Sequence, residues 1–308
     1  MRVLLATDGS PSAEHATSLV ASVAWPAGSA VHVVIAFDER PDMLGAPFLL
    51  TDEHYGRLRN DAEQADEGIL QRAIARLARP GLEVDGEVLD GRPATCIVQA
   101  AMTWQADLVV IGHRGLGPFR TMLLGSVSAE VVDHAPCPVL VARRDQVGEA
   151  ILADDGSETA QAGLEFLVTH PELAPRAVEV LCVADVTYPM TAVLATPVGA
   201  GAVGDWEASA EAIRSATTES ADAAAARLEA AGLNASSASR EGDPAHEIVH
   251  AAHEHDSDLI VLGSHGRAGL ARLLLGSVAR NVLLEAPCSV LIVRRPRPPG
   301  TTGQSPTA

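Results

Sequence analysis

This chain of 308 residues contains an internal duplication, which narrows the folds that it can adopt. One stretch begins at Asp107 and reads DLVVIGHRGLGPFRTMLLGSVSAEVVDHAPCPVLVARR; another begins at Asp258 and reads DLIVLGSHGRAGLARLLLGSVARNVLLEAPCSVLIVRR. The two stretches align without a gap at an offset of 151 residues. A second match opens each copy, with LLATDGS at Leu4 and ILADDGS at Ile151, at an offset of 147. A repeat of this length indicates one domain present twice, because solenoid repeats are much shorter.

The duplication sets the predicted domain plan. We expect one domain over 1–145 and a second over 146–295, each of a common size for a globular domain. The remaining residues, 296–308, are rich in Pro, Gly, Ser and Thr, which predicts a disordered tail. The second copy also contains an apolar stretch with Gly and Pro at 186–204, which we interpret as a long loop before a helix.

Each copy alternates short apolar runs with amphipathic stretches. In the first copy, residues 3–7 form a continuous apolar run, typical of a strand buried on both faces of a parallel sheet. Ser10 and Pro11 follow as an N-cap and a first helical residue. The other expected elements are strands at 31–37, 82–89, 108–111 and 138–142, and helices at 52–78, 94–104 and 127–134. This alternation predicts an α/β fold of two duplicated, doubly wound domains with parallel sheets.

The composition excludes several classes of protein. All 22 basic side chains are arginine, against 40 Asp and Glu, so the net charge is −18. Without lysine there is no GxxxxGK[ST] phosphate loop and no lysine Schiff base. An acidic chain with 3% aromatic residues is also poorly suited to bind nucleic acid.

The same composition guides the expected location of the protein. No apolar run approaches the ~20 residues of a membrane span, and the start lacks the apolar region of a signal peptide. We therefore expect a cytoplasmic protein with no nucleic-acid or membrane partner and with reduced cysteines. Two of these, Cys137 and Cys288, occupy matching positions, and we assign them to the core of the last strand of each copy.

Glycines after the fourth expected strand of each copy predict an anion site. The spacing G-x2-G-x9-G-S starts at Gly112 in the first copy and at Gly263 in the second. In an open parallel sheet, ligands bind beyond the carboxyl ends of the strands, where the strand order reverses. Glycines let backbone N–H groups approach a phosphate closely, and a helix N terminus adds unpaired donors and partial positive charge. In the absence of lysine, these amides and Arg114, or His265 and Arg267 in the second copy, supply most of the positive potential.

Together with an Asp after the first strand of each copy, this glycine pattern resembles that of the ATP-binding universal stress proteins in their tandem-domain form. The likeness covers both copies up to the tail. It implies a five-stranded parallel sheet in each copy, in the order 3-2-1-4-5, with edge strands that pair across a two-fold axis. The two copies would then associate like the subunits of a dimer, and a homodimer of the whole chain remains open. The resemblance also implies ATP, with or without Mg²⁺, as the ligand of each copy.

The resemblance further implies which residues contact the nucleotide. The first-strand Asp binds ribose, the backbone at the end of the second strand reads adenine, and the residue before the first glycine lines the pocket. The glycines and the pair that opens the next helix hold the phosphates. In the first copy these positions are Asp8, Ala36, Ile111, Gly112, Gly115, Gly125, Ser126 and Val127, with Arg114 in the loop. In the second they are Asp155, Val183, Leu262, Gly263, Gly266, Gly276, Ser277 and Val278, with His265 in place of Arg114. That exchange predicts two sites of different phosphate affinity.

Two features suggest metal binding instead. The sequence HEIVH at 246–250 has the zinc-binding spacing HExxH, with a glutamate that could act as a base. The matching stretch of the first copy, TCIVQ at 95–99, lacks these ligands, so we favour exposed histidines around a buried Ile-Val pair. Asp154 stands where the first copy has Thr7 and is a candidate Mg²⁺ ligand, although a polar residue at a strand end explains it better.

The sequence favours nucleotide binding over turnover. No Ser-His-Asp or Cys-His arrangement is recognisable by motif, and no lysine is available to stabilise a leaving phosphate. We therefore predict a nucleotide-dependent regulatory protein of the stress response with one ATP site per domain. Two alternatives stay open: a slow ATPase or nucleotidyl-transfer enzyme, and a scaffold with vestigial sites that contacts partners through 186–204.

Overall fold

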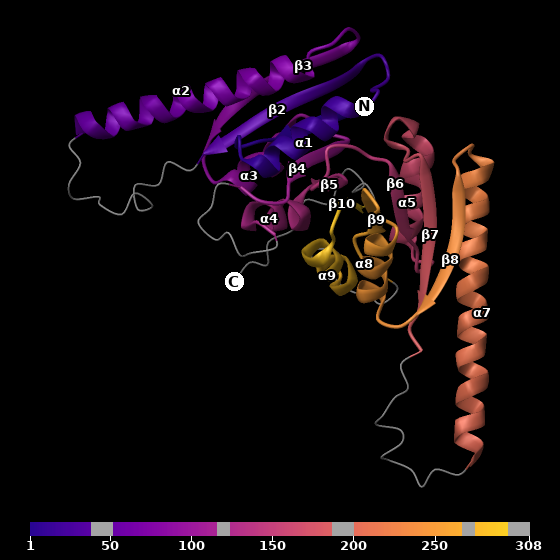
Figure 1. Cartoon of the computed structure of the whole chain (residues 1–308). Coiled ribbons are helices and arrows are strands. Elements are labelled where there is room, and N and C mark those ends of the chain that lie inside the picture. The colour runs from indigo at the N-terminus through magenta and orange to yellow at the C-terminus, as the bar shows by residue number, and fades with distance from the viewer. Residues whose placement is uncertain (38–51, 116–123, 187–199, 267–274, 295–308) are drawn as a thin grey trace, which may run out of the picture.

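The computed structural model describes residues 1–37, 52–115, 124–186, 200–266 and 275–294 (Figure 1). The first copy contains β1 (Arg2–Ala6), α1 (Pro11–Ser22), β2 (Ser29–Phe37), α2 (Asp52–Leu77), β3 (Leu82–Asp90), α3 (Pro93–Thr103), β4 (Leu108–Gly112), α4 (Ser126–His134) and β5 (Val139–Ala142). The second copy contains β6 (Glu149–Ala153), α5 (Glu158–Thr169), the short 3-10 helix η2 (Pro171–Leu173), β7 (Ala177–Ala184), α7 (Ala200–Ala230), β8 (Ala235–Glu241), α8 (Pro244–Glu254), β9 (Leu259–Gly263), α9 (Ser277–Glu285) and β10 (Ser289–Val293).

All of these strands form one sheet, in the order β3-β2-β1-β4-β5-β10-β9-β6-β7-β8. Each copy contributes five parallel strands in the order 3-2-1-4-5, which confirms the predicted fold. The copies join where β5 and β10 pair antiparallel, with Leu140 opposite Leu291. Because these two leucines match at the 151-residue offset, the local two-fold axis that relates the copies passes between them.

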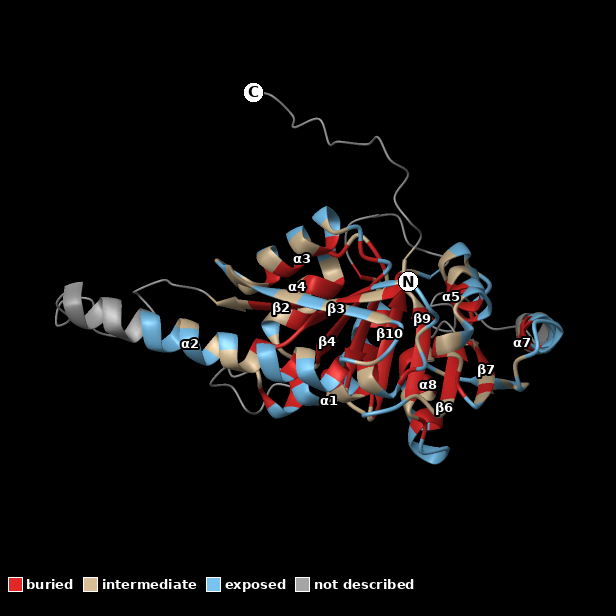
Figure 2. Ribbon diagram, turned by 90° about the horizontal axis from the view of Figure 1, so that it is seen from above, coloured by how far each residue is buried: buried red, intermediate tan, exposed pale blue. Residues whose placement is uncertain are grey.

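The burial of each strand follows its place in the sheet. Every residue of β4, β5 and β10 is buried, whereas the edge strand β3 only alternates between partly buried and exposed residues. Helices α3, α4, α8 and α9 cover one face of the sheet, and α1, α2, α5 and α7 cover the other. Each of the two hydrophobic cores runs without a break from one copy into the other. Figure 2 shows this: the buried residues gather in the central strands, and α2 and α7 carry exposed residues at the two ends.

The start of α1 agrees with the sequence prediction. Ser10 is the N-cap, its Oγ accepts a hydrogen bond from the Ala13 N–H at 3.2 Å, and Pro11 is the first helical residue. The predicted loop at 186–204 is wrong at its end, because α7 already begins at Ala200. Its run of alanines and other good helix formers outweighs the two glycines of the first turns. Residues 187–199 and the predicted tail lie outside the described residues.

The matching cysteines are core residues, but they do not lie within the last strands. Cys137 and Cys288 precede β5 and β10, and both are buried. In the first copy the reason is Pro138, which has no N–H for the strand ladder. Burial raises the pKa of each thiol to about 12, which makes both unreactive. Among the described residues, no helix is both long and apolar enough to cross a membrane.

Candidate functional site

A cavity of about 570 Å³ opens at the carboxyl ends of β1, β2 and β4 in the first copy. Since β1 lies between β2 and β4, the strand order reverses here, as expected for a ligand site in an open α/β sheet. All nine residues predicted for the first site line this cavity: Asp8, Ala36, Ile111, Gly112, Arg114, Gly115, Gly125, Ser126 and Val127. They come from four separate segments of the chain, which the sheet brings to one place.

The turn after β1 presents Asp8 to the cavity. Its Oδ1 accepts a hydrogen bond from the Ser10 N–H at 3.0 Å. Gly9, between them, has φ +71°, a conformation that residues with a side chain rarely adopt. The loop after β4 comes very close to the same carboxylate: a Cβ added to Gly115 would lie 2.5 Å from Asp8 Oδ2. Asp8 and the glycine-rich loop therefore form one continuous wall.

Ser12 holds the loop after β4 against α1. Its Oγ accepts a hydrogen bond from the Arg114 N–H at 2.9 Å and lies 2.8 Å from His113 Nδ1. On the far side of the loop, the Gly125 N–H donates to the His113 carbonyl at 2.8 Å, immediately before α4 begins. The first N–H groups of a helix have no acceptor within the helix and carry partial positive charge. The cavity wall at the start of α4 is therefore suited to an anion.

Some lining residues were not selected from the sequence. They include Ser12, Ile97, His113 and Leu124. A signal for Ser12 existed, since the second copy has Thr159 at the matching position and both carry a hydroxyl. No comparable signal existed for His113, whose counterpart is Ser264.

The His113 imidazole is neutral in the folded protein at physiological pH. Burial lowers its pKa from 6.5 to about 4, and the nearby Arg143 and Arg114 guanidinium groups act in the same direction. The hydrogen bond to the Ala142 carbonyl opposes this effect only partly. A neutral ring fits the contact with Ser12, because one ring nitrogen can then serve as donor and the other as acceptor.

This pKa predicts a loss of stability in acid. The unfolded chain binds a proton at this histidine near pH 6.5, but the folded chain does so only near pH 4, so protonation favours unfolding between those values. The contribution is absent above pH 6.5 and grows as the pH falls to about 4. After allowance for solvent screening, we expect His113→Gln to recover about 1 kcal/mol of the free energy of unfolding at the acid end of this window. Urea unfolding of both proteins at several pH values measures the effect, and parallel pH profiles would contradict it.

The second copy repeats the backbone frame. The Ser157 N–H donates to Asp155 Oδ1 at 2.9 Å, and the intervening glycine again has a positive φ, +72°. A Cβ on Gly266 would lie 2.8 Å from Asp155 Oδ2, and the Gly276 N–H donates to the Ser264 carbonyl at 2.8 Å. The predicted residues lie at corresponding places: Asp155 after β6, Val183 in β7, Leu262 and Gly263 at the end of β9, His265 and Gly266 in the loop, and Gly276, Ser277 and Val278 at the start of α9.

His265 takes the place of Arg114 in the second loop. Its carbonyl accepts a hydrogen bond from Ser157 Oγ at 3.4 Å, as the Arg114 carbonyl does from Ser10 Oγ, and a further one from Thr159 Oγ1. The ring Nδ1 lies 3.0 Å from Ser264 Oγ, and Nε2 is buried without a hydrogen-bond partner among the described residues. The side chain is thus folded into the loop. Unequal phosphate affinity stays a prediction.

The residues behind the two metal-binding hypotheses have other roles in the structure. His246 and His250 are exposed on α8 with their rings stacked 6.0 Å apart, and Ile248 between them is buried. Asp154 is 7% exposed and accepts a hydrogen bond from the Gly156 N–H at 2.7 Å, a contact that Thr7 makes in the first copy. In the part of the chain that the structure describes, no three His, Cys, Asp or Glu residues form a group that could hold a metal ion.

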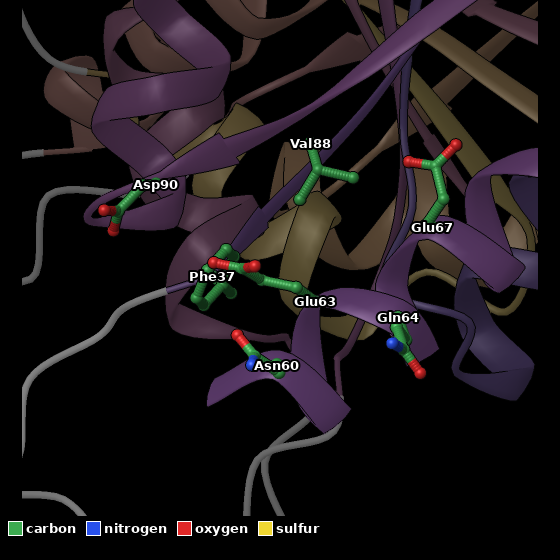
Figure 3. A pocket seen from close by; sticks show the side chains of 7 residues that line it. All are labelled: Phe37, Asn60, Glu63, Gln64, Glu67, Val88 and Asp90. Atoms are coloured by element: carbon green, nitrogen blue, oxygen red, sulfur yellow. The ribbon is translucent and has the colours of Figure 1, made fainter. Parts of the chain in front are cut away.

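A second cavity, of about 430 Å³, lies between α2 and the ends of β2 and β3. Its lining residues are Phe37, Asn60, Glu63, Gln64, Glu67, Val88 and Asp90. Figure 3 shows that the three carboxylates are spread around the cavity and do not converge on one point. On the same helix, burial raises the pKa of Asp66, and the nearby Asp8 carboxylate acts in the same direction.

The fold and the first cavity place the chain among the doubly wound α/β proteins that carry a glycine-rich loop at the switch point of the sheet. Within that class it belongs to the universal stress protein family, whose family model matches residues 1–143 and 149–294. The chain therefore contains two such domains in tandem, as the sequence resemblance implied.

Individual relatives agree with this assignment. A universal stress protein of Thermus aquaticus is 41% identical over 141 residues, which cover 46% of this chain and 97% of that protein. One of Mycolicibacterium smegmatis is 26% identical over 286 residues, covering 88% of this chain and 83% of the relative. The crystal structure of a universal stress protein from Archaeoglobus fulgidus shares the fold, with a TM-score of 0.64, 20% identity and coverage of 96% of this chain and 98% of that one.

Proposed function

We propose that this protein binds one adenine nucleotide, ATP, in each copy and acts as a nucleotide-dependent regulatory protein of the cytoplasm in the stress response. One observation carries the proposal: the residues that the family pattern assigns to the nucleotide converge on a cavity of about 570 Å³. That volume lies within the ~300–1,000 Å³ typical of small-ligand pockets. The matching frame around Asp155 and Gly266 extends the proposal to the second copy.

The proposed contacts follow from the chemistry of the cavity wall. The Asp8 carboxylate, oriented by the Ser10 N–H, is an acceptor for the ribose hydroxyls. The backbone of Ala36 faces the adenine from the end of β2. The phosphates accept hydrogen bonds from the N–H groups of Gly115 and of the start of α4, and Arg114 adds a fixed positive charge. The close approach of Gly115 to Asp8 supports this assignment, because any side chain there would displace the carboxylate. If Mg²⁺ accompanies ATP, we assign it no protein ligand.

Binding is proposed in preference to turnover because the titratable groups at the cavity already have structural partners. Asp8 accepts from the Ser10 N–H, His113 lies 2.8 Å from Ser12 Oγ, and His15 lies 2.6 Å from Asp145. A general base must reach the attacking water, and each of these groups would have to do so in addition to its present contact.

Native mass spectrometry of the full chain tests the proposal. We expect two bound adenine nucleotides after incubation with ATP, and a rise in melting temperature at millimolar ATP. At a ligand concentration of 100 Kd the stabilisation is about 2.7 kcal/mol per site. A protein that carries no nucleotide and shows no thermal shift would refute the proposal. Release of phosphate over many turnovers would instead favour the slow ATPase.

A further inference from the structure

The helices that open at the two proposed phosphate sites meet at the interface between the copies. Arg143 Nη2 donates to the Leu283 carbonyl in the last turn of α9 at 2.6 Å, and Arg294 donates to the Val132 carbonyl in the last turn of α4. These contacts match each other at the 151-residue offset, so the local two-fold axis relates them. Each copy therefore holds the carboxyl end of the helix whose amino end opens the other copy's site, where a cation is favourable.

Asp133 breaks this symmetry. It lies in the last turn of α4, and its side chain is only 15% exposed. Its Oδ1 accepts a hydrogen bond from the Leu275 N–H at 3.3 Å, one residue before the Gly276-Ser277 pair of the second site. Its two oxygens also lie 3.1 and 3.2 Å from Nη2 of Arg280, which is in the first turns of α9. A carboxylate from the first copy is thus placed at the edge of the second copy's phosphate loop.

The matching position of the second copy, which the two-fold axis relates to Asp133, has different chemistry. At the 151-residue offset, the counterpart of Asp133 is Leu284, and the counterpart of Arg280 is Ala129. Leu284 is 37% exposed. The position that corresponds to Asp133 therefore carries no charge toward the first copy's loop, and no arginine stands at the corresponding point of α4.

We propose that Asp133 is a positioning and specificity residue of the second nucleotide site, one that lowers the affinity of this site for polyphosphates. The inference rests on the proposed nucleotide-binding function. The carboxylate repels phosphate charge directly, and by pairing with Arg280 it cancels a positive charge close to the same amides. Both effects grow with the charge of the ligand. The second site therefore favours ATP over AMP less than the first site does, and the contact between the copies sets that difference.

Titration calorimetry on the full chain with ATP, AMP and adenosine tests this inference. The Gly115→Ala background leaves the second site, and the Gly266→Ala background leaves the first. In the former, Asp133→Asn keeps an oxygen for the Leu275 N–H but removes the charge, so we expect ATP to bind about five- to tenfold more tightly. AMP should gain less and adenosine nothing, a gradation that a purely structural role would not produce. In the Gly266→Ala background the same substitution should change nothing.

The reciprocal variant provides an independent check. Leu284→Asp introduces the missing carboxylate toward the first copy's loop, and it should weaken ATP binding at the first site, again with little effect on adenosine. Unchanged or weaker ATP binding at the second site of Asp133→Asn would overturn the inference and leave nucleotide binding standing. Absence of any nucleotide binding by the unsubstituted chain would overturn the proposed function and this inference together.

Discussion

Alanine at both Gly115 and Gly266 is expected to abolish nucleotide binding in the two copies while leaving the fold intact. The added Cβ would lie 2.5 Å from Asp8 Oδ2 in the first copy and 2.8 Å from Asp155 Oδ2 in the second. In each case the obstacle is the end of a short side chain, so the carboxylate moves and the backbone need not. The proposed ribose ligand is then lost, and the methyl group also intrudes on the loop. We expect affinity to fall at least 100-fold, about 2.7 kcal/mol at each site.

Native mass spectrometry and calorimetry measure this loss, and each single substitution should leave one nucleotide bound. Gly68→Ala is a matched control in α2, where the nearest atom to the new Cβ is the Arg72 guanidinium at 3.5 Å. That control should bind two nucleotides. A double variant that retained both would show that the glycine-rich loops do not hold the ligand.

Gly112→Ala is expected to lower the stability of the fold, in addition to any effect on nucleotide binding. Its Cβ would lie 2.6 Å from the Ser12 carbonyl oxygen and 2.8 Å from the Ala13 nitrogen. Both atoms belong to the backbone of α1, so the helix must move away from β4 and the core between them must repack. We expect the free energy of unfolding to fall by about 2–4 kcal/mol. Gly263→Ala should behave alike, because its Cβ would lie 2.6 Å from the Thr159 carbonyl carbon.

Urea unfolding measures this effect, and Gly163→Ala provides the control. Gly163 is a buried glycine of α5, but its Cβ would lie 3.4 Å from Leu152 Cδ1, an ordinary contact distance. In a helix, alanine is more favourable than glycine by about 1 kcal/mol, so this control should be neutral or stabilising. A Gly112→Ala protein as stable as the control would mean that β4 and α1 are less tightly packed than the structure indicates.

The fold was largely predictable because its signals are local and are written twice. Apolar runs locate the central strands to within one or two residues, and Ser10-Pro11 marks the start of α1 correctly. The errors arise where local signals compete. Glycine and proline in 186–204 suggested a loop, but the alanine-rich run starts α7 at Ala200. The cysteines were placed too far into their strands, because burial alone does not distinguish a strand from the residue before it.

From the amino-acid sequence alone, the duplicated α/β fold and the meeting of the segments after β1 and β4 were predictable, because parallel strands end at one edge of the sheet. Other residues of the first cavity, such as Ala36 and Ile111, were assigned through the family resemblance. The side chains that support this set became evident only in the tertiary structure. Ser12 meets His113 across 101 residues, and Asp133 meets Leu275 across 142. Such contacts depend on how two packed helices and a loop align to within an ångström, and neither periodicity nor residue type along the chain records that alignment.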